Sequence, residues 1–143
     1  MSTYVPGPDV EPGAIGMTVL EARSDEEKER IRGLGREIAK EMLGMPGFVG
    51  WVSAVIGRRM FTFTAWDTPD APKKQLRASG THREAMKLFF GPDLAAGGQT
   101  GVWTPHRLNG MWVRCAECGE MVEASDADRC PCGAELSARP RWF

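Results

Sequence analysis

The chain is poor in the residues on which most functional sites depend. It has two histidines and one tyrosine, and no cysteine occurs before Cys115. It has no surplus of charge of either sign, because 18 Lys and Arg residues oppose 19 Asp and Glu residues, for a net charge of −1. Binding to nucleic-acid phosphates needs an excess of Lys and Arg, so the composition argues against that class. Neither G-x-x-x-x-G-K-[ST] nor G-x-G-x-x-G, the common phosphate-binding motifs, occurs.

Long hydrophobic runs are also missing. The longest mainly apolar stretch covers residues 48–57, and a membrane-spanning helix needs about 20 residues. The first residues, Met-Ser-Thr-Tyr-Val-Pro, have neither the basic nor the apolar part of a secretory signal, so we expect a cytoplasmic protein that does not associate with membranes. With 143 residues, 42% of them hydrophobic, the chain has room for one domain and a small appendage.

All four cysteines fall in one short segment. Cys115, Cys118, Cys130 and Cys132 form a C-x2-C pair and a C-x-C pair, and a glycine follows each pair. Four thiolates in two close pairs suit tetrahedral Zn²⁺, and a glycine after each pair permits the positive φ of a metal-binding turn. Two disulfides are an alternative that needs an oxidising compartment, and iron or an iron–sulfur cluster is another.

A zinc ion in this segment is expected to be structural, with one ion per chain. Four cysteines fill the coordination shell and leave no open position for substrate or water. The segment contains few apolar residues, so metal binding must supply much of its folding free energy. Four thiolates and one Zn²⁺ would bring the net charge to about −3. Residues 111–136 resemble a zinc ribbon of the rubredoxin-like kind.

The remainder of the chain predicts alternating strands and helices. Residues 1–15, rich in Pro and Gly, predict a flexible arm, and residues 16–23 predict a strand. Ser24 and Glu27 form a capping box, which predicts that a helix follows and ends at Gly44. One face of this helix is apolar at a helical period, through Ile31, Leu34, Ile38, Met42 and Leu43.

A hairpin and a short helix come next. Residues 48–57 and 60–66 predict two strands, with Gly57 available for the turn between them. Thr68 then predicts the N-cap of a short helix, with Pro69 in its first position.

The last part of the main domain predicts a helix, a loop and a strand. A second capping box begins at Thr81 and leads a helix to about Phe90. Residues 95–101 predict a flexible, glycine-rich loop, and residues 102–106 predict a strand at a sheet edge, because Pro105 cannot donate to a ladder.

The order of these elements is that of a βαββαβ ferredoxin-like domain, an α+β fold. We therefore expect an arm at 1–15, a ferredoxin-like domain at 16–110, and a zinc ribbon with a tail at 111–143. Helices would cover one face of the sheet, and the other face carries Trp and Val. Since such a face is rarely left exposed, we expect a second copy to cover it in a twofold homodimer.

Three segments carry a resemblance to a known family. These are Met-Pro-Gly-Phe-Val-Gly at 45–50, Phe-Thr-Phe-Thr-Ala-Trp-Asp at 61–67 and Ser-Gly-Thr-His-Arg-Glu-Ala-Met at 79–86. Through these three segments, residues 16–110 resemble the antibiotic biosynthesis monooxygenase-like domains of the dimeric α+β barrel superfamily. The resemblance implies a pocket between sheet and helices that binds a small aromatic or polyketide-like molecule. Some members of the family oxidise a phenol or quinol with O₂ and without a cofactor.

That chemistry needs an apolar cavity, a group that deprotonates or holds the phenol, and donors for the oxyanion. His82 is the candidate acid–base group, and Trp66 the candidate ring wall and N–H donor. His106 is the second candidate histidine, with Arg107 and Asn109 near it in sequence. Each of the three main candidates has a structural alternative, namely an exposed helix residue for His82, strand-end core for Trp66 and an edge residue for His106.

Two function classes follow from the sequence. The first is a cofactor-independent monooxygenase or related oxidoreductase acting on a small aromatic or polyketide-like molecule. The second is a non-catalytic binding or scaffold protein whose ribbon mediates assembly or docks a protein partner. Nucleic-acid binding through the ribbon is disfavoured, because residues 111–143 contain four Arg and six acidic residues.

Overall fold

The computed structural model describes residues 2–138 and Pro140. The chain divides into two compact units, the first extending to Pro105 and the second starting at His106. Each unit has its own β-sheet. In the described part of the chain, no helix is both long enough and apolar enough to cross a membrane.

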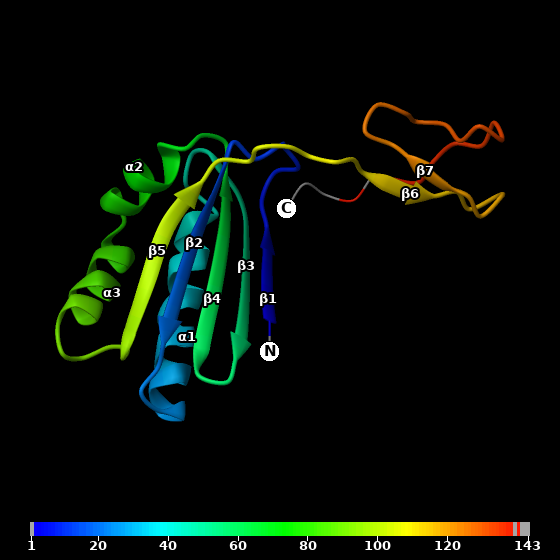
Figure 1. Ribbon diagram of the computed structural model, residues 1–143. Coiled ribbons are helices and arrows are strands. Elements are labelled where there is room, and N and C mark those ends of the chain that lie inside the picture. Colours follow the sequence, from blue (N-terminus) through cyan, green and yellow to red (C-terminus); the bar gives the residue numbers. More distant parts are fainter. Residues whose placement is uncertain (1, 139, 141–143) are drawn as a thin grey trace. The chain divides into compact units, whose positions relative to one another are not determined.

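The first unit is an antiparallel sheet with three helices on one side (Figure 1). Its elements are β1 (Ser2–Pro6), β2 (Ala14–Glu21), α1 (Asp25–Met42), β3 (Phe48–Ile56), β4 (Arg59–Trp66), α2 (Ala71–Ala78), α3 (Gly80–Phe90) and β5 (Gly97–Trp103). The strands lie in the order β1-β3-β4-β2-β5. From β2 onward the chain runs strand, helix, strand, strand, two helices, strand, so the predicted ferredoxin-like α+β arrangement is confirmed.

Strand β1 takes up the first part of the flexible arm that the sequence predicted for residues 1–15, and β2 already begins at Ala14. Ser2–Pro6 pairs antiparallel with β3 at one edge of the sheet. The run of Pro and Gly that suggested an arm begins at the end of this strand. Pro6 is tolerated there because an edge strand has one side without ladder bonds. The next residue, Gly7, donates its N–H to the Val49 carbonyl at 3.0 Å.

Helix α1 starts at the predicted cap, with one difference. The Ser24 side chain accepts the backbone N–H of Glu27 at 3.1 Å, as a capping box requires. The Glu27 carboxylate, however, accepts the backbone N–H of Arg23 at 2.7 Å instead of that of Ser24. The Arg23 guanidinium also binds this carboxylate, with Nε at 2.9 Å. The start of α1 is therefore fixed by a charged contact as well as by its cap.

The two short helices begin at other residues than the sequence predicted. The N-cap of α2 is Asp70 and not Thr68. The N-cap of α3 is Ser79, whose Oγ accepts the backbone N–H of His82 at 2.9 Å, so the capping box predicted at Thr81 is wrong. Ser79 has extended backbone angles, φ −67° and ψ 125°, so it ends α2 and caps α3 at the same time.

Strand β5 occupies the segment predicted as a glycine-rich loop at 95–101, and it ends before the strand predicted at 102–106 would. Gly97–Trp103 pairs antiparallel with β2 along its whole length. Packing explains the glycine at 98, because a Cβ there would lie 2.6 Å from both the Leu20 side chain and the Val19 carbonyl oxygen. Glycine in this strand thus allows close packing and does not indicate a loop.

The sheet turns one face to the helices and leaves the other uncovered in this unit. Tyr4, Val52 and Phe63 lie opposite one another on the uncovered face. Ile56 and Trp103 belong to the same face and are 69% and 60% exposed. The uncovered face is therefore broadly apolar, as the sequence predicted for the face without helices.

The second unit is built on a short two-stranded sheet. Strands β6 (Trp112–Arg114) and β7 (Met121–Glu123) pair antiparallel, with Val113 opposite Val122. The turn between these strands carries the first cysteine pair, and the loop after β7 carries the second.

Candidate functional site

A cavity of about 720 Å³ lies between the helices and the sheet of the first unit. Its lining includes members of both groups of buried core residues, Met42 of the group that contains Trp66 and Ile31 and Met60 of the other. Its walls are mainly apolar and include Trp51. Sites for small molecules usually occupy roughly 300–1,000 Å³, so the cavity has the size of a ligand site.

A row of five hydroxyl groups crosses the floor of this cavity, one from each strand. The strand registers place Thr3 opposite Ser53, then Thr62, Thr18 and Thr100 in turn. All five residues line the cavity. The hydroxyl oxygens of Thr18 and Thr100 are 3.3 Å apart. This hydroxyl row gives the floor uncharged groups that can donate or accept hydrogen bonds.

Trp66 lies behind the cavity wall, and its side chain contacts Thr64, which lines the cavity. Its side chain is fully buried, and its ring packs edge-on against Phe48 with the ring centres 5.7 Å apart. Its Nε1–H donates to Thr64 Oγ1 at 2.8 Å, and Thr64 lines the cavity. Among the described residues, the tryptophan that lines the cavity is Trp51. Trp66 is therefore placed to orient a hydroxyl, whereas the sequence suggested that its ring would form the wall.

His82 is the one cavity-lining residue in the described part of the chain with a side chain that titrates near neutral pH. Burial lowers the pKa of His82 below its ordinary value, although a hydrogen bond with the Leu76 backbone and the charge of Glu41 oppose this shift. The ring is therefore neutral at pH 7. Since one ring nitrogen donates to the Leu76 carbonyl, the other is left as an acceptor.

A hydrogen-bond network holds the start of α3, and with it His82, against α1. Ser79 Oγ donates to Glu41 Oε2 at 2.7 Å while it accepts the His82 backbone N–H. The hydrogen bond from Ser79 lowers the pKa of Glu41, and hydrogen bonds from Thr81 and Gly80 add to this effect. Glu41 thus places a carboxylate at the positive N-terminal end of a helix, where it is stabilised.

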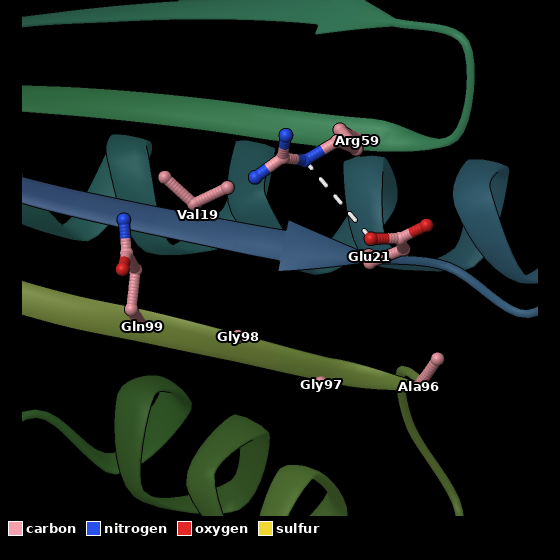
Figure 2. A pocket seen from close by; sticks show the side chains of 7 residues that line it. All are labelled: Val19, Glu21, Arg59, Ala96, Gly97, Gly98 and Gln99. Atoms are coloured by element: carbon pink, nitrogen blue, oxygen red, sulfur yellow. Dashed lines mark ion pairs between the residues drawn. The ribbon is translucent and has the colours of Figure 1, made fainter.

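A second, smaller depression of about 280 Å³ lies at the start of β5 (Figure 2). Arg59 on β4 reaches toward Glu21 on β2, with 4.0 Å between Nε and Oε2. The guanidinium also stacks on the Phe61 ring, 5.5 Å from its centre. Among the described residues that line the depression there is no histidine, cysteine or hydroxyl side chain, and the Glu21 carboxylate faces Arg59. We therefore place the candidate site in the larger cavity.

The four cysteines of the second unit converge as the sequence predicted. Their sulfur atoms all lie within 4.8 Å of one another. Cys115 and Cys132 are 3.7 Å apart at Sγ, and Cys118 and Cys130 are 3.5 Å apart. A disulfide needs about 2.05 Å, whereas four sulfurs about 2.3 Å from a central zinc ion are about 3.8 Å from one another. The cysteine cluster therefore fits a tetrahedral metal ion.

The two turns that carry the cysteines have the backbone geometry of metal-binding turns. Gly119 has φ +76° and Gly133 has φ +94°, so each glycine adopts the left-handed conformation that the sequence predicted. Hydrogen bonds from the backbone N–H groups of Cys118 and Glu117 lower the pKa of Cys115 to about 7. Backbone amides directed at a sulfur favour the thiolate, which is the form that binds a metal.

Comparison with known proteins identifies the fold of the first unit. No protein-family model and no curated protein matches the chain, but solved structures do. A protein from Deinococcus radiodurans assigned as an antibiotic biosynthesis monooxygenase has a TM-score of 0.56 at 16% identity, covering 66% of this chain and 94% of its own. The first unit has the antibiotic biosynthesis monooxygenase-like fold.

Two further structures with this fold have functional descriptions. SnoaB, a cofactor-independent oxygenase from Streptomyces nogalater, has a TM-score of 0.53 at 16% identity, covering 67% of this chain and 95% of its own. A monooxygenase from Streptomyces coelicolor, solved with the ligand nanaomycin D, has a TM-score of 0.56 at 14% identity, covering 68% of this chain and 90% of its own. At these identities the likeness concerns the fold.

The predicted site residues are divided between the unit with the antibiotic biosynthesis monooxygenase-like fold and the second unit. His82 lines the cavity, Trp66 supports a lining residue, and the four cysteines form one cluster. His106 is exposed and belongs to the second unit, so its role in the site stays a prediction. The same unit contains Arg107, whose Nε donates to Asn109 Oδ1 at 2.8 Å.

The sequence reasoning missed the hydroxyl row and the contact between Ser79 and Glu41. Part of the signal for the row was present, because Thr62 and Thr64 alternate with Phe61 and Phe63 in β4. The other members of the row lie on strands whose register no local pattern reveals. The contact between Ser79 and Glu41 joins residues 38 positions apart and has no local signal at all.

Proposed function

We propose that the first unit is a cofactor-independent monooxygenase or a related oxidoreductase that acts on a small aromatic or polyketide-like molecule. The observation that carries this proposal is a cavity of ligand size with an apolar wall, a floor of neutral hydroxyl groups and one neutral histidine. The fold shared with SnoaB, which is described as a cofactor-independent oxygenase, supports the same reaction class.

The reaction we propose converts a ring CH₂ group and O₂ into a carbonyl group and water. His82 accepts a proton from the substrate, and the resulting anion is stabilised by hydrogen bonds from the hydroxyl row. Electron transfer from this anion to O₂ and formation of the C–O bond give a peroxide anion, which takes the proton back from His82. Loss of water breaks the O–O bond and leaves the carbonyl group. Trp66 has a positioning role, through its hydrogen bond to Thr64.

Oxygen consumption with anthrone tests this proposal, because anthrone and O₂ give anthraquinone and water by this stoichiometry. We expect His82→Gln to lower kcat by about 10²–10⁴-fold, the usual contribution of a general base. The rate of the unmodified protein should rise with pH through the lowered pKa of His82 and then level off. Anthrone oxidation no faster than in buffer, or unchanged by His82→Gln, would overturn the proposal. His106→Gln is the matched variant. An unchanged rate of oxidation in this variant would show that His106 has no role in the site.

The proposal for the second unit is one structural zinc ion per chain, bound by Cys115, Cys118, Cys130 and Cys132. The spacing of the sulfur atoms and the two glycine turns support it. We also propose a reducing compartment such as the cytoplasm, because the four cysteines must stay reduced to bind the ion. Elemental analysis of the purified protein should give one zinc per chain, and iron or no metal would contradict this assignment.

A homodimer is the third part of the proposal. The apolar sheet face that the helices leave uncovered supports it, because an exposed apolar face of this kind usually marks an interface. Analytical ultracentrifugation should show a dimer, and Phe63→Glu should convert it to a monomer. Thr68→Glu, at an exposed position outside the sheet, is the control for the added charge.

A non-catalytic binding or scaffold protein is the alternative function. The closed metal site on a separate unit supports it, since such a site offers no position for substrate. In that case the ribbon would mediate assembly or dock a protein partner. Deletion of residues 111–143 should then abolish assembly or partner recovery while the first unit stays folded. Unchanged assembly and partner recovery would contradict this alternative.

A further inference from the structure

Five basic side chains line the cavity at its solvent edge. These basic-edge residues are Arg32, Arg36, Lys40, Lys73 and Arg77. The first three follow one another at four-residue spacing on α1, and the last two do so on α2. Side chains four residues apart share one face of a helix. Two helices therefore each present a row of positive charges to the same cavity.

The cavity lining contains no carboxylate in the part of the chain that the structure describes. This asymmetry is not a property of the chain as a whole, which has 19 acidic residues and 18 basic ones. Arg32 and Lys40 form ion pairs with Glu29 and Glu37 on α1.

The other three basic-edge residues differ from Arg32 and Lys40 in this respect. Among the described residues, no carboxylate forms an ion pair with Arg36, Lys73 or Arg77. All three side chains are exposed. Their charges therefore remain hydrated and available to a ligand that enters from solvent.

The interior of the same cavity excludes charge. Its walls are apolar, and its floor carries the hydroxyl row, which has no net charge. A molecule charged throughout would lose hydration inside the cavity without gaining an opposite charge. A molecule with an apolar body and an anionic group at one end would satisfy both regions.

We propose that the cavity binds an organic anion whose apolar, ring-containing body lies over the hydroxyl row and whose carboxylate, sulfonate or phosphate group lies at the basic edge. This inference rests on the proposed function for the location of the site, and it adds the charge of the substrate. The basic-edge residues determine which substrates bind. The reacting end of the substrate still lies near His82.

A pair of fluorescent probes tests the inference on the full-length protein. Anilinonaphthalene sulfonate and N-phenylnaphthylamine share an aromatic body, and only the first carries an anionic group. We expect the sulfonate to bind at least about tenfold more tightly at low salt, and this difference to shrink as salt screens exposed charges. Equal affinities, or a difference that does not respond to salt, would overturn the inference.

Single substitutions locate the charge effect. Arg36→Gln, Lys73→Gln and Arg77→Gln should each weaken binding of the sulfonate by about fivefold, the effect of one hydrated charge near contact distance. None should alter binding of the neutral probe. Lys74→Gln is the matched control, because Lys74 adjoins Lys73 on α2 and is exposed but does not line the cavity. An equal loss with Lys74→Gln would assign the effect to overall charge and overturn the inference.

A blocking variant separates the cavity from the apolar sheet face, which also attracts such probes. Gly35 lines the cavity, and a Cβ there would lie 3.8 Å from the Trp51 ring, so Gly35→Leu places a side chain in the cavity without a backbone clash. Both probes should lose affinity in this variant. Retained binding of the sulfonate would show that it binds elsewhere and would overturn the inference.

The inference and the proposed function fail in different ways. Binding that depends on the basic edge, together with no oxidation of anthrone, would overturn the oxygenase and leave the anion site standing. Oxidation that depends on His82, together with equal affinity for both probes, would overturn the anion site and leave the oxygenase. Absence of binding by either probe would overturn the cavity as a ligand site and with it both proposals.

Discussion

The hydroxyl of Ser79 lies 2.7 Å from the carboxylate of Glu41, and this contact joins the start of α3 to the end of α1. The same hydroxyl caps α3 by accepting the His82 backbone N–H. The position and the charge state of His82 therefore depend on a residue of another helix.

Replacing Glu41 should make His82 harder to protonate. The negative charge of Glu41 raises the pKa of His82 against the larger, opposite effect of burial. We expect Glu41→Gln to lower the pKa of His82 further, as measured by an NMR titration of its ring protons with His106→Gln used for assignment. Glu37→Gln, an exposed position on the same helix, is the control. An upward shift in Glu41→Gln would contradict the assigned contact.

Glu27 should stabilise the fold at neutral pH and cease to do so in acid. Hydrogen bonds from Arg23 lower the pKa of Glu27 from 4.5 to about 2 in the folded chain. The stabilisation is therefore complete above the unfolded pKa and is lost as the pH falls through about 2. In urea titrations, Glu27→Gln should lower the free energy of unfolding at pH 7, and the difference should shrink toward pH 2. Glu26→Gln is the exposed control, and equal effects of the two changes would argue against this contact.

Two adjacent glycines in β5 should differ in how well they tolerate alanine. A Cβ at Gly98 would clash with the Val19 carbonyl oxygen, whereas a Cβ at Gly97 meets nothing within 4 Å. We expect Gly98→Ala to destabilise the first unit by about 1–3 kcal/mol, the typical cost of overpacking. Gly97→Ala should leave its stability within about 0.5 kcal/mol. Thermal unfolding of the two variants makes the comparison, and similar melting temperatures would show that β5 packs less closely than described.

Metal removal should unfold the second unit and spare the first. Among its described residues the second unit has two strands of three residues each, so the bound ion must supply most of its folding free energy. In ¹H–¹⁵N spectra of the full chain, a strong chelator should shift the resonances of residues 111–136 to unfolded positions. Resonances of β2 to β5 should stay in place. Added zinc should return the resonances of residues 111–136 to their folded positions. A ribbon that keeps its native resonances in the chelator would contradict a metal-dependent fold.

Local patterns in the sequence were enough to predict much of the fold. Helix α1 follows from its apolar period and the cap at Ser24, and the β3–β4 hairpin from its two apolar strands around Gly57. The metal cluster follows from cysteine spacing alone, because ligand number and geometry are local properties.

The remaining features depend on contacts between distant segments. Strand β1 is stabilised by pairing with β3, which overrides its Pro-rich neighbourhood. Strand β5 looks like a loop because it is rich in glycine, but Gly98 is explained by its closeness to the Leu20 side chain and the Val19 carbonyl oxygen and not by backbone freedom. The cavity floor needs the register of all five strands, and the basic edge needs α1 and α2 to line the same cavity. No window of the sequence contains that information.

The hydroxyl row has a consequence for how the proposed reaction would end. A hydroxyl group can rotate its hydrogen, so each member of the row donates to a carbonyl oxygen as readily as it accepts from a phenol. The floor would therefore hold the oxidised molecule with the same partners that held its precursor. Product would then compete with substrate for the cavity, and turnover would be governed by how fast the oxidised molecule leaves.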